Sequence, residues 1–440
     1  MSSFDLAPNN YLQVFISCVL YSYHFMLQTS IISTPEELKL QYIRPLTPHI
    51  ANSIHIQHMI APPYDVVDRA QAYHLAMQSP KNFLHITRAD ADLEASITEY
   101  HPQVYALAKQ QYQSFIEQQW LQITTQPTYY IYQIETASHV QTGFFARVHL
   151  SAYHDGALKR HELTRPIKEN DRMSHIVALN AQMSPALFSY LPDKALAMFL
   201  QEVMSQVPLL LQAQLHEETH RIWDIPPHLN EKMQKHMDEL GALYIADGHH
   251  RVAAAARVAA QHSTVEAAQY VFAGLFPSDE LQILGYHRLV KDLNGLSVWE
   301  WMQVCEEWFS IEVAAQPVQP TDPLEVGMYV AGQWYRLKYT HAVDDLVTSI
   351  PSERLTHEIL TPLLDIVDLR TDPRIEFVGG MQALQQCATK IDNQDAAVAF
   401  ILPPVTFAQM QQVADLRQVM PPKSTWFEPK LADGLLVYPF

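Results

Sequence analysis

Glycine is scarce in this chain: only 12 of its 440 residues are glycine. None of them forms a G-x-G-x-x-G or G-x-x-x-x-G-K-[ST] pattern, which excludes the dinucleotide fingerprint and the Walker loop. The G-x-S-x-G turn of α/β-hydrolases is missing as well, which excludes a serine nucleophile on that turn. If the chain binds a nucleotide, another kind of turn must hold the phosphates.

Cysteine is also rare, with three residues far apart at Cys18, Cys305 and Cys387. No C-x-x-C pair is present, which argues against a disulfide framework and a structural zinc site. This usage fits a reducing compartment, so we expect a cytoplasmic protein. The 22 histidines include no H-E-x-x-H motif, because His161-Glu162 lacks the second histidine.

Positive charge is in deficit, since 29 Lys and Arg face 47 Asp and Glu for a formal net charge of −18. No run of five or more basic residues occurs. A protein that coats a nucleic acid needs a basic face, so we expect no strong nucleic-acid binding. A local basic pocket for a small anionic ligand is compatible with this composition.

Long hydrophobic runs are missing too. The most apolar stretch near the N-terminus, Val14–Leu27, is interrupted by polar residues and is too short to cross a bilayer. No Lys or Arg precedes Lys39, so the positively charged start of a signal peptide is missing. We expect no membrane association. Residues 1–40 are predicted to be an N-terminal extension, either an appended helix or sequence upstream of a natural start at Met26.

The rest of the chain mixes short strands and helices, which predicts an α+β (mixed α/β) fold. We expect a core domain over residues 41–290 and a C-terminal α+β domain over residues 291–440. The patterns predict strands at Thr128–Ile134, Gly143–Leu150, Leu243–Ala246, Tyr270–Phe276 and Ala396–Leu402, a hairpin of Gly327–Val330 with Trp334–Tyr339, and helices at Asp68–Met77, His101–Trp120, Val252–Gln261, Ser297–Phe309, Ser352–Leu364 and Thr406–Leu416.

The most informative feature is the turn Asp247-Gly248-His249-His250-Arg251, between a predicted strand and an Ala-rich helix. A helix N-terminus presents unpaired N–H groups and the positive end of a dipole, so it binds anions. Gly248 permits close backbone approach and Arg251 can form a fork with a phosphate. Asp247 is a candidate metal ligand or general base. Alternatively, Asp247 only caps the helix and the histidines pack beneath a strand.

A dense charged segment, Lys159–Arg172, is the second candidate, and we expect it to be irregular. Glu162 and Asp171 can bind a cation or take a proton, while Arg165 and Arg172 can neutralise a transferring phosphate. A solvated, salt-bridged loop is an equally good interpretation of this segment alone.

Three shorter motifs complete the candidate site. Near the C-terminus, the ammonium of Lys423 and the hydroxyls of Ser424 and Thr425 can bind an anion. Alternatively, this segment only packs the C-terminus against the core. Pro62-Pro63 can hold a tyrosine and a carboxylate rigidly, and a His-Arg pair at a strand end can add a cation. The residues of these motifs are Lys423, Ser424, Thr425, Tyr64, Asp65, His287 and Arg288.

Together these motifs resemble, in order, those of the bacterial and archaeal domain of unknown function 1015 family. The resemblance runs from about Tyr42 to the C-terminus. It rests on Ala61–Val66, His161-Glu162-Leu163-Thr164, Asp171-Arg172, Ala246–Arg251, His287-Arg288, Thr356–Leu369 and Pro421–Lys430.

The turn at Asp247 also resembles that of free-serine kinases in the ParB and sulfiredoxin superfamily. This second resemblance implies a ParB/sulfiredoxin-like core with a mixed sheet, in which the helix start handles nucleotide phosphates. It also implies that acidic residues support Mg²⁺ and proton removal. The chain lacks an evident basic helix-turn-helix, so we do not expect a role in DNA segregation.

We therefore expect a nucleotide-dependent small-molecule kinase that uses Mg²⁺ and ATP or ADP and acts on free serine or a similar hydroxyl compound. Two alternatives stay open: a nucleotide-binding regulator without catalysis, and a phosphatase or hydrolase of phosphorylated metabolites. The expected site comprises catalytic Asp247 (also the metal ligand), Glu162, His249 and His250; phosphate- or nucleotide-binding Gly248, Arg251, Arg165, Arg172, Arg288, Lys423, Ser424 and Thr425; and supporting Tyr64, Asp65, His161, Asp171 and His287.

Overall fold

The computed structural model describes residues 42–343 and 345–440. The predictions for residues 1–40, including Val14–Leu27 and a start at Met26, concern residues outside this description. Within the described ranges, no helix is long and apolar enough to cross a membrane. Cys305 and Cys387 are both buried.

The largest sheet has nine strands in the order β6-β11-β8-β12-β5-β4-β10-β9, with β1 paired to β5. Strands β6 and β11 are parallel, as are β8 and β12, and the other neighbours are antiparallel. The fold is therefore mixed α/β with a mixed sheet. Its strands are β1 (Ile43–Arg44), β4 (Tyr130–Glu135), β5 (Val140–His149), β6 (Leu158–Lys159), β8 (Ala186–Tyr190), β9 (Leu211–Leu215), β10 (Glu218–Asp224), β11 (Leu243–Asp247) and β12 (Tyr270–Pro277).

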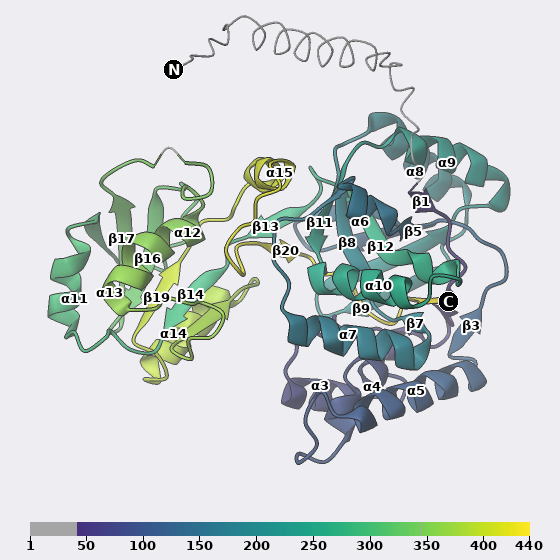
Figure 1. Cartoon of the computed structure of the whole chain (residues 1–440), viewed down its shortest axis with the longest axis horizontal. Helices are drawn as coiled ribbons and strands as arrows, with labels where there is room; N and C mark the ends of the chain where they lie inside the picture. Colours follow the sequence, from purple (N-terminus) through teal and green to yellow (C-terminus); the bar gives the residue numbers. More distant parts are fainter. Residues whose placement is uncertain (1–41, 344) are drawn as a thin grey trace, which may run out of the picture. The chain divides into compact units, whose positions relative to one another are not determined.

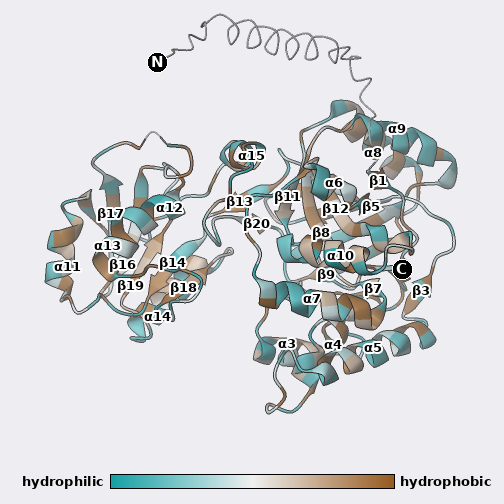
Figure 2. Ribbon diagram, viewed as in Figure 1, coloured by the Kyte–Doolittle hydropathy of each residue, from teal (hydrophilic) through white to brown (hydrophobic). Residues whose placement is uncertain are grey.

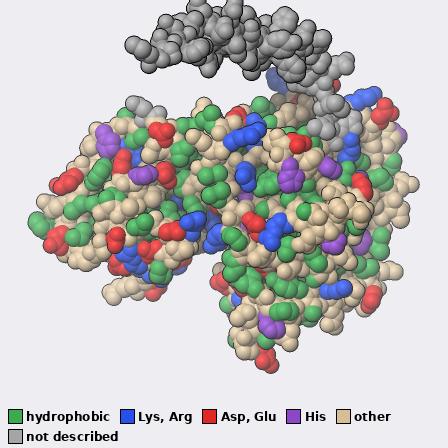
Figure 3. Space-filling view, viewed as in Figure 1, with side chains coloured by type: hydrophobic (Ala, Val, Ile, Leu, Met, Phe, Trp, Pro, Cys, Tyr) green, Lys and Arg blue, Asp and Glu red, His purple; other side chains and the backbone are tan. Residues whose placement is uncertain are grey.

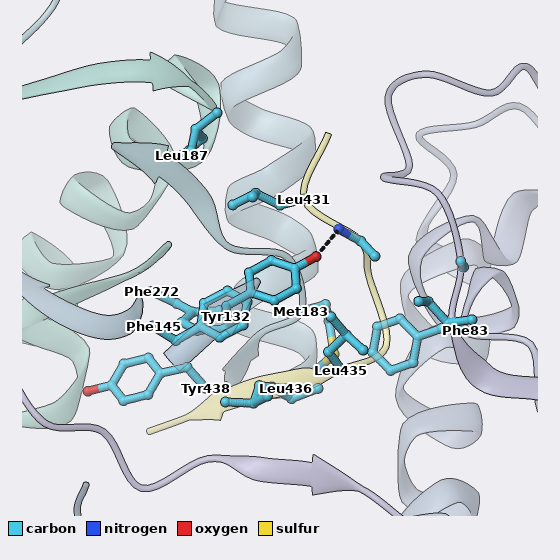
Figure 4. Close-up of a cluster of buried hydrophobic side chains, with 14 of the residues drawn as sticks. Phe83, Tyr132, Phe145, Met183, Leu187, Phe272, Leu431, Leu435, Leu436 and Tyr438 are labelled. Carbon is cyan, nitrogen blue, oxygen red and sulfur yellow. Dashed lines mark hydrogen bonds between the residues drawn. The ribbon is translucent and has the colours of Figure 1, made fainter. Parts of the chain in front are cut away.

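Side chains alternate across each strand, so both faces of this sheet carry hydrophobic layers. One layer contains the aromatic rings of Tyr132, Phe145 and Phe272, against which the C-terminal segment packs (Figure 4). The backbone N–H of Ala432 donates to Tyr132 Oη at 3.3 Å. This layer fixes the end of the chain against the middle of the sheet.

The opposite layer packs against α8 (Lys194–Gln206), α9 (Asn230–Glu239) and α10 (His249–Gln261). Small side chains on α10 let a second helix, α7 (Pro166–Leu179), pack against it, with Ile176 touching Ala254 and Val258 (Figure 1). The remaining helices of this part are α2 (Ile56–Met59), α3 (Arg69–Ala76), α4 (Leu84–Thr87), η1 (Ala89–Asp92), α5 (Pro102–Glu117), α6 (Ser151–Asp155), η2 (Pro227–Leu229) and η3 (Ala267–Gln269).

Two small sheets tie distant segments together. A four-stranded sheet has the order β3-β2-β21-β7, and it joins the last strand of the chain to strands near its beginning. A two-stranded sheet pairs β13 with β20. The strands are β2 (His49–Ala51), β3 (Leu121–Ile123), β7 (Ala181–Gln182), β13 (Gln282–Leu284), β20 (Trp426–Glu428) and β21 (Leu436–Pro439).

A six-stranded sheet, in the order β15-β17-β16-β19-β14-β18, has its own hydrophobic layers. Hydropathy colouring shows apolar residues concentrated on its inner strands (Figure 2). Its elements are β14 (His287–Val290), β15 (Phe309–Ala314), β16 (Glu325–Val330), β17 (Gln333–Tyr339), β18 (Ile375–Val378) and β19 (Val398–Ile401), with helices α11 (Val298–Cys305), α12 (Pro351–Leu355), the π-helical turn η4 (Thr356–Leu360), α13 (Thr361–Leu364), α14 (Ala383–Asp392) and α15 (Phe407–Asp415).

Most predicted elements are present within a few residues of their expected bounds, including the β4–β5 and β16–β17 hairpins. One expectation was wrong: the segment Lys159–Arg172 is not irregular throughout, because α7 already begins at Pro166. Proline suits the first turn of a helix, where its missing N–H leaves no hydrogen bond unmade. The proposed domain boundary at residue 290 stays a prediction.

Candidate functional site: a charged cavity at the start of helix α10

A cavity of about 690 Å³ opens where β11 ends and α10 begins. It gathers predicted residues that lie far apart in the sequence, and Glu162, Asp247 and Lys423 share it. The predicted residues in its wall are Tyr64, Asp65, Glu162, Arg165, Asp171, Arg172, Asp247, Gly248, His249, His250, Arg251 and Lys423.

Parallel pairing of β6 with β11 explains why two of the motifs meet. Leu158 lies beside Leu243 and Lys159 beside Tyr244. Because both strands run in the same direction, the residues that follow them also run side by side. His161-Glu162 therefore lies next to the Asp247–His249 turn, although more than eighty residues separate the two motifs in the chain.

The turn itself depends on Gly248, whose φ of +96° is in the left-handed region. A Cβ at this position would lie 3.1 Å from the Ala186 Cβ on the neighbouring strand β8. Gly248 is the N-cap residue of α10, and no side chain caps the helix. Asp247 therefore does not act as the N-cap, and the first N–H groups of α10 have no acceptor within the helix.

Asp247 lies between two cations. Its carboxylate is 2.8 Å from Arg251 NH2 and 3.5 Å from Lys430 Nζ. Burial alone would raise the pKa of Asp247, but Lys430, Arg251 and Lys423 together hold it well below its usual range. Asp247 therefore stays ionised at every pH at which the protein is expected to work.

Arg251 is largely committed to the protein. Its side chain is 9% exposed and contacts Asp247 and also Asp65 at 3.4 Å. It also donates to the carbonyl oxygen of Pro185. Arg251 thus holds the two carboxylates in place, and its predicted fork onto a phosphate stays a prediction.

The two histidines of the turn are neutral. His250 Nε2 accepts a hydrogen bond of 2.9 Å from the backbone N–H of Arg165, so its proton is on Nδ1. Burial, then the nearby Arg165 and Lys423, lower the pKa of His250 to about 4. Burial also places the pKa of His249 well below its ordinary value. Neither ring can supply a proton at neutral pH unless a ligand changes its surroundings.

His161 and Glu162 adjoin the ring of His249. The His161 and His249 rings meet edge to face with centroids 4.5 Å apart. Burial raises the pKa of Glu162, which Lys423 partly offsets, while burial lowers the pKa of His161 to about 4. One ligand atom from each of His161, Glu162 and His249 lies within 4.8 Å of the others, so these three residues could hold a metal ion.

Arg165 and Lys423 face the cavity without a carboxylate partner. Among the described residues, neither Arg165 nor Lys423 forms an ion pair with Asp or Glu within 4.0 Å, and both side chains are exposed. Lys423 Nζ lies 5.4 Å from the centre of the Tyr286 ring. Arg69 also lines the cavity without such an ion pair, but its guanidinium donates to the carbonyl oxygens of Leu93, Glu94 and Ile97. Among the described residues of the wall, Arg165 and Lys423 are therefore the cations that remain free to pair with a bound anion.

Arg172 is held in a fixed position in the wall. Its guanidinium lies 3.9 Å from the centre of the Tyr64 ring and binds Asp171 Oδ2 at 2.8 and 2.6 Å. The hydroxyl of Tyr105 donates to the other oxygen of Asp171 at 2.9 Å. Asp171 thus neutralises Arg172, whose remaining contact surface is presented to the cavity beside Tyr64.

More than half of the residues in this wall are not indicated by the sequence motifs. Those residues come from the segment 67–105, which begins just before α3 and runs into α5, and from Lys168 and His175 of α7. Only the fold brings this segment to the turn, and no local motif distinguishes its charged residues from ordinary surface ones. The missed charged, aromatic and histidine residues are Asp68, Arg69, Arg88, Asp90, Glu99, Tyr100, Tyr105, Lys168 and His175. Lys430 of the C-terminal segment pairs with Asp247.

Five predicted residues do not line the cavity. Arg288 is fully buried and donates to the carbonyl oxygens of Tyr286 and Lys423, so it supports the Lys423 segment from behind. The others have protein partners: His287 with the N–H of Leu402, Ser424 with Ser352 and Pro421, and Thr425 with His161. Their predicted part in binding would be indirect.

A family model and several solved structures match this chain. No curated protein matches the chain. A mutant free serine kinase in complex with AMP aligns with a TM-score of 0.35 and 12% identity, over 64% of this chain and 87% of that one. A conserved hypothetical protein from Pyrococcus furiosus gives 0.34 and 12%, over 67% and 95%. SbnI with a C-terminal truncation, from Staphylococcus aureus, gives 0.34 and 12%, over 66% and 85%.

These structural similarities are too weak to support an argument about function. The sequence comparison is stronger, because one family model matches residues 43–366, which is most of the chain. That family is described as "Protein of unknown function (DUF1015)", and this chain belongs to it.

Proposed function

We propose that this protein binds a nucleotide in the cavity and transfers a phosphoryl group between it and a small hydroxyl compound such as free serine. One observation carries the proposal. The uncapped start of α10 and the unpaired cations Arg165 and Lys423 face the same cavity as the carboxylates of Glu162 and Asp247. Phosphoryl transfer needs such a combination of anion binding and a proton acceptor in one place.

The phosphate-binding side is the turn and its neighbours. Gly248 allows a phosphate to approach the backbone, and the first N–H groups of α10 point towards it. Arg165 and Lys423 would pair with the phosphate oxygens, and Arg172 would add positive charge beside Tyr64. The His250 Nδ1–H is a further donor whose direction is fixed by the bond from Arg165 to Nε2.

The proton acceptor is Glu162. Its pKa is raised by burial, and a carboxylate with a raised pKa is a better general base near neutral pH than an ordinary one. Asp247 has the opposite environment, because its neighbours keep it ionised. The two carboxylates therefore suit different tasks: Glu162 would remove a proton and Asp247 would bind a cation.

The residues also fit the Mg²⁺ that such a reaction uses. The neighbouring cations hold the pKa of Asp247 well below its usual range, and Asp65, which also contacts Arg251, has a side chain that is 40% exposed. Carboxylate oxygens that keep water-accessible positions are the ligands Mg²⁺ prefers. When bound, the ion would neutralise charge on the phosphates of ATP or ADP. A cavity of about 690 Å³ is within the range of small-molecule sites.

We also propose, as part of the same function, that the nine-stranded sheet and its helices form a ParB/sulfiredoxin-like core.

The test is a direct assay on the full chain. The protein is incubated with ATP or ADP, Mg²⁺ and serine, and phosphoserine is measured by mass spectrometry, followed by other hydroxyl compounds if serine is inert. We expect Glu162→Gln to lower the rate by about 10²–10⁴-fold and Asp247→Asn by about 10²–10³-fold. Glu202→Gln changes an exposed carboxylate on α8 and should have the wild-type rate.

Other outcomes select the two alternatives. Nucleotide binding without turnover of any hydroxyl compound would indicate a nucleotide-binding regulator. Release of inorganic phosphate without an acceptor would indicate a phosphatase or hydrolase. Equal rates for the wild type and both cavity variants would place the chemistry elsewhere and overturn the proposal.

A further inference from the structure

His161, Glu162 and His249 form a cluster that phosphate binding does not use. His161 follows β6, Glu162 is the next residue, and His249 is the first residue of α10. The parallel pairing of β6 and β11 brings them together, and one ligand atom of each lies within 4.8 Å of the others. Two imidazoles and one carboxylate converging on one point are a common protein site for a transition metal.

The same cluster contains a buried nitrogen without a hydrogen-bond partner among the described residues. His161 is 2% exposed, and its Nδ1 is buried without a hydrogen-bond partner in the part of the chain that the structure describes. A buried polar atom without a partner is costly, so most such atoms are satisfied by protein, water or an ion. Coordination through Nδ1 would satisfy it and leave His161 Nε2 to donate to Thr425 Oγ1, 3.4 Å away. That is the arrangement in which metal-binding histidines are usually held.

The cluster is prearranged for an ion. Bonds of about 2.0–2.2 Å put the ligand atoms of one ion roughly 3–4 Å apart, so small side-chain rotations would close the present spread. The backbone N–H of His161 lies 3.5 Å from His249 Nε2, and the N–H of Met420 donates to the His161 carbonyl oxygen at 2.8 Å. Backbone contacts on both sides therefore hold the His161 segment in position.

We infer that His161, Glu162 and His249 bind one divalent first-row transition-metal ion, such as Zn²⁺, at the edge of the charged cavity. Imidazole nitrogens favour such ions over Mg²⁺, which prefers oxygen ligands. Three protein ligands would leave open positions, and Glu162 lines the cavity, so a ligand there could reach the ion. The site is distinct from the Asp247 carboxylate, which is held by Arg251 and Lys430.

This inference does not rest on the proposed phosphoryl transfer. A metal at this cluster would take Glu162 as a ligand, whereas the kinase proposal uses the free carboxylate as a base. Metal binding is therefore measured without nucleotide or serine, so that failure of one proposal leaves the other intact.

The experiment titrates the chelator-treated full chain with Zn²⁺, Co²⁺ and Mg²⁺ by calorimetry. We expect one equivalent of Zn²⁺ or Co²⁺ to bind at least 10-fold more tightly than Mg²⁺. Bound Co²⁺ should show the visible absorption of a nitrogen- and oxygen-ligated site. His161→Asn, Glu162→Gln and His249→Asn should each weaken Zn²⁺ binding more than 10-fold, with folding checked by circular dichroism.

Two matched controls separate the cluster from other histidines. His216→Asn changes an exposed histidine between β9 and β10, and His250→Asn changes the neighbour of His249 that lies outside the cluster. Both should bind Zn²⁺ as the wild type does. The inference is overturned if the wild type binds no equivalent of Zn²⁺ or Co²⁺, or if Glu162→Gln binds them unchanged. If a histidine variant fails to fold, the test is the proton NMR spectrum of the Co²⁺-loaded wild type. It should contain paramagnetically shifted imidazole signals, and their absence would also overturn the inference.

Discussion

At the scale of single residues, the cavity is lined by titratable side chains whose pKa values are shifted from their usual range. Asp247 is held ionised by three cations, while burial raises the pKa of Glu162. Burial also keeps several histidines neutral, including His175, which lines the cavity from α7. Such opposed shifts in one cavity are typical of functional sites, because burial without a function would select uncharged residues.

His175 gives a prediction about pH. Burial and then Arg172 lower its pKa to about 4 from an unfolded value of 6.5, so between these pH values only the unfolded chain takes up this proton. The contribution of neutral His175 to the free energy of unfolding is complete above pH 6.5 and is lost as the pH falls towards 4. His175→Gln keeps a donor for the Ile86 carbonyl oxygen, which His175 Nε2 contacts at 3.1 Å, and removes the titration.

Urea denaturation at pH 7.5 and pH 5 tests this prediction. Between the two pH values, the free energy of unfolding should fall by about 2 kcal/mol more for the wild type than for His175→Gln, because one pKa unit corresponds to about 1.4 kcal/mol. His216→Asn removes an exposed histidine and should lose as much as the wild type. Equal losses in wild type and His175→Gln would show that this residue titrates normally in the folded protein.

At the scale of elements, the decisive feature is the junction of β11 and α10. Gly248 has a left-handed backbone and lies against Ala186 of β8. Its conformation aims the start of α10 at the cavity and leaves the helix uncapped. A helix that began with an ordinary capping residue would satisfy its own N–H groups and bind an anion less well.

Gly248→Ala should therefore lower the free energy of unfolding by about 1–3 kcal/mol, from left-handed strain and the close Ala186 side chain. It should also weaken binding of inorganic phosphate. Gly241→Ala is the matched control, because nothing lies within 4 Å of its Cβ position, and it should change stability by less than about 0.5 kcal/mol. Chemical denaturation and phosphate titration measure both effects, and a Gly248→Ala protein as stable as Gly241→Ala would contradict the account of the turn.

At the scale of the whole molecule, the end of the chain completes structure laid down near its beginning. Strand β21 pairs with β2 and β7, and its side chains enter the same hydrophobic layer as those of α5 and β4. The segment before it supplies Lys423 to the cavity and Lys430 to the carboxylate of Asp247. Site and core therefore depend on the same C-terminal segment.

On the face seen in Figure 3, acidic and basic side chains are interspersed.

Leu436→Ala tests this dependence. Leu436 is 2% exposed in β21, so truncation should cost about 2–5 kcal/mol of unfolding free energy. Met198→Ala removes a side chain of similar size that is 71% exposed on α8 and should cost less than about 0.5 kcal/mol. Urea denaturation compares the two. A Leu436→Ala protein as stable as Met198→Ala would show that β21 adds little to the folded state.

The sequence by itself determined the local features: the strand and helix types, the turn at Asp247–Arg251 and its suitability for an anion. These follow from short-range patterns, because hydrophobic period, glycine conformation and helix ends are encoded within a few residues. It also indicated Glu162, through a segment of dense charge, and Lys423, through an ammonium next to two hydroxyls.

Only the tertiary structure decided which of these motifs share a cavity. Pairing of β6 with β11 placed His161 and Glu162 against His249, and the returning C-terminal segment placed Lys430 beside Asp247 while burying Arg288 behind Lys423. The charges of Arg88 and Asp90 became part of the wall by the same route. Contacts between distant residues are set by sheet register and by packing of whole elements, which no local stretch of sequence encodes.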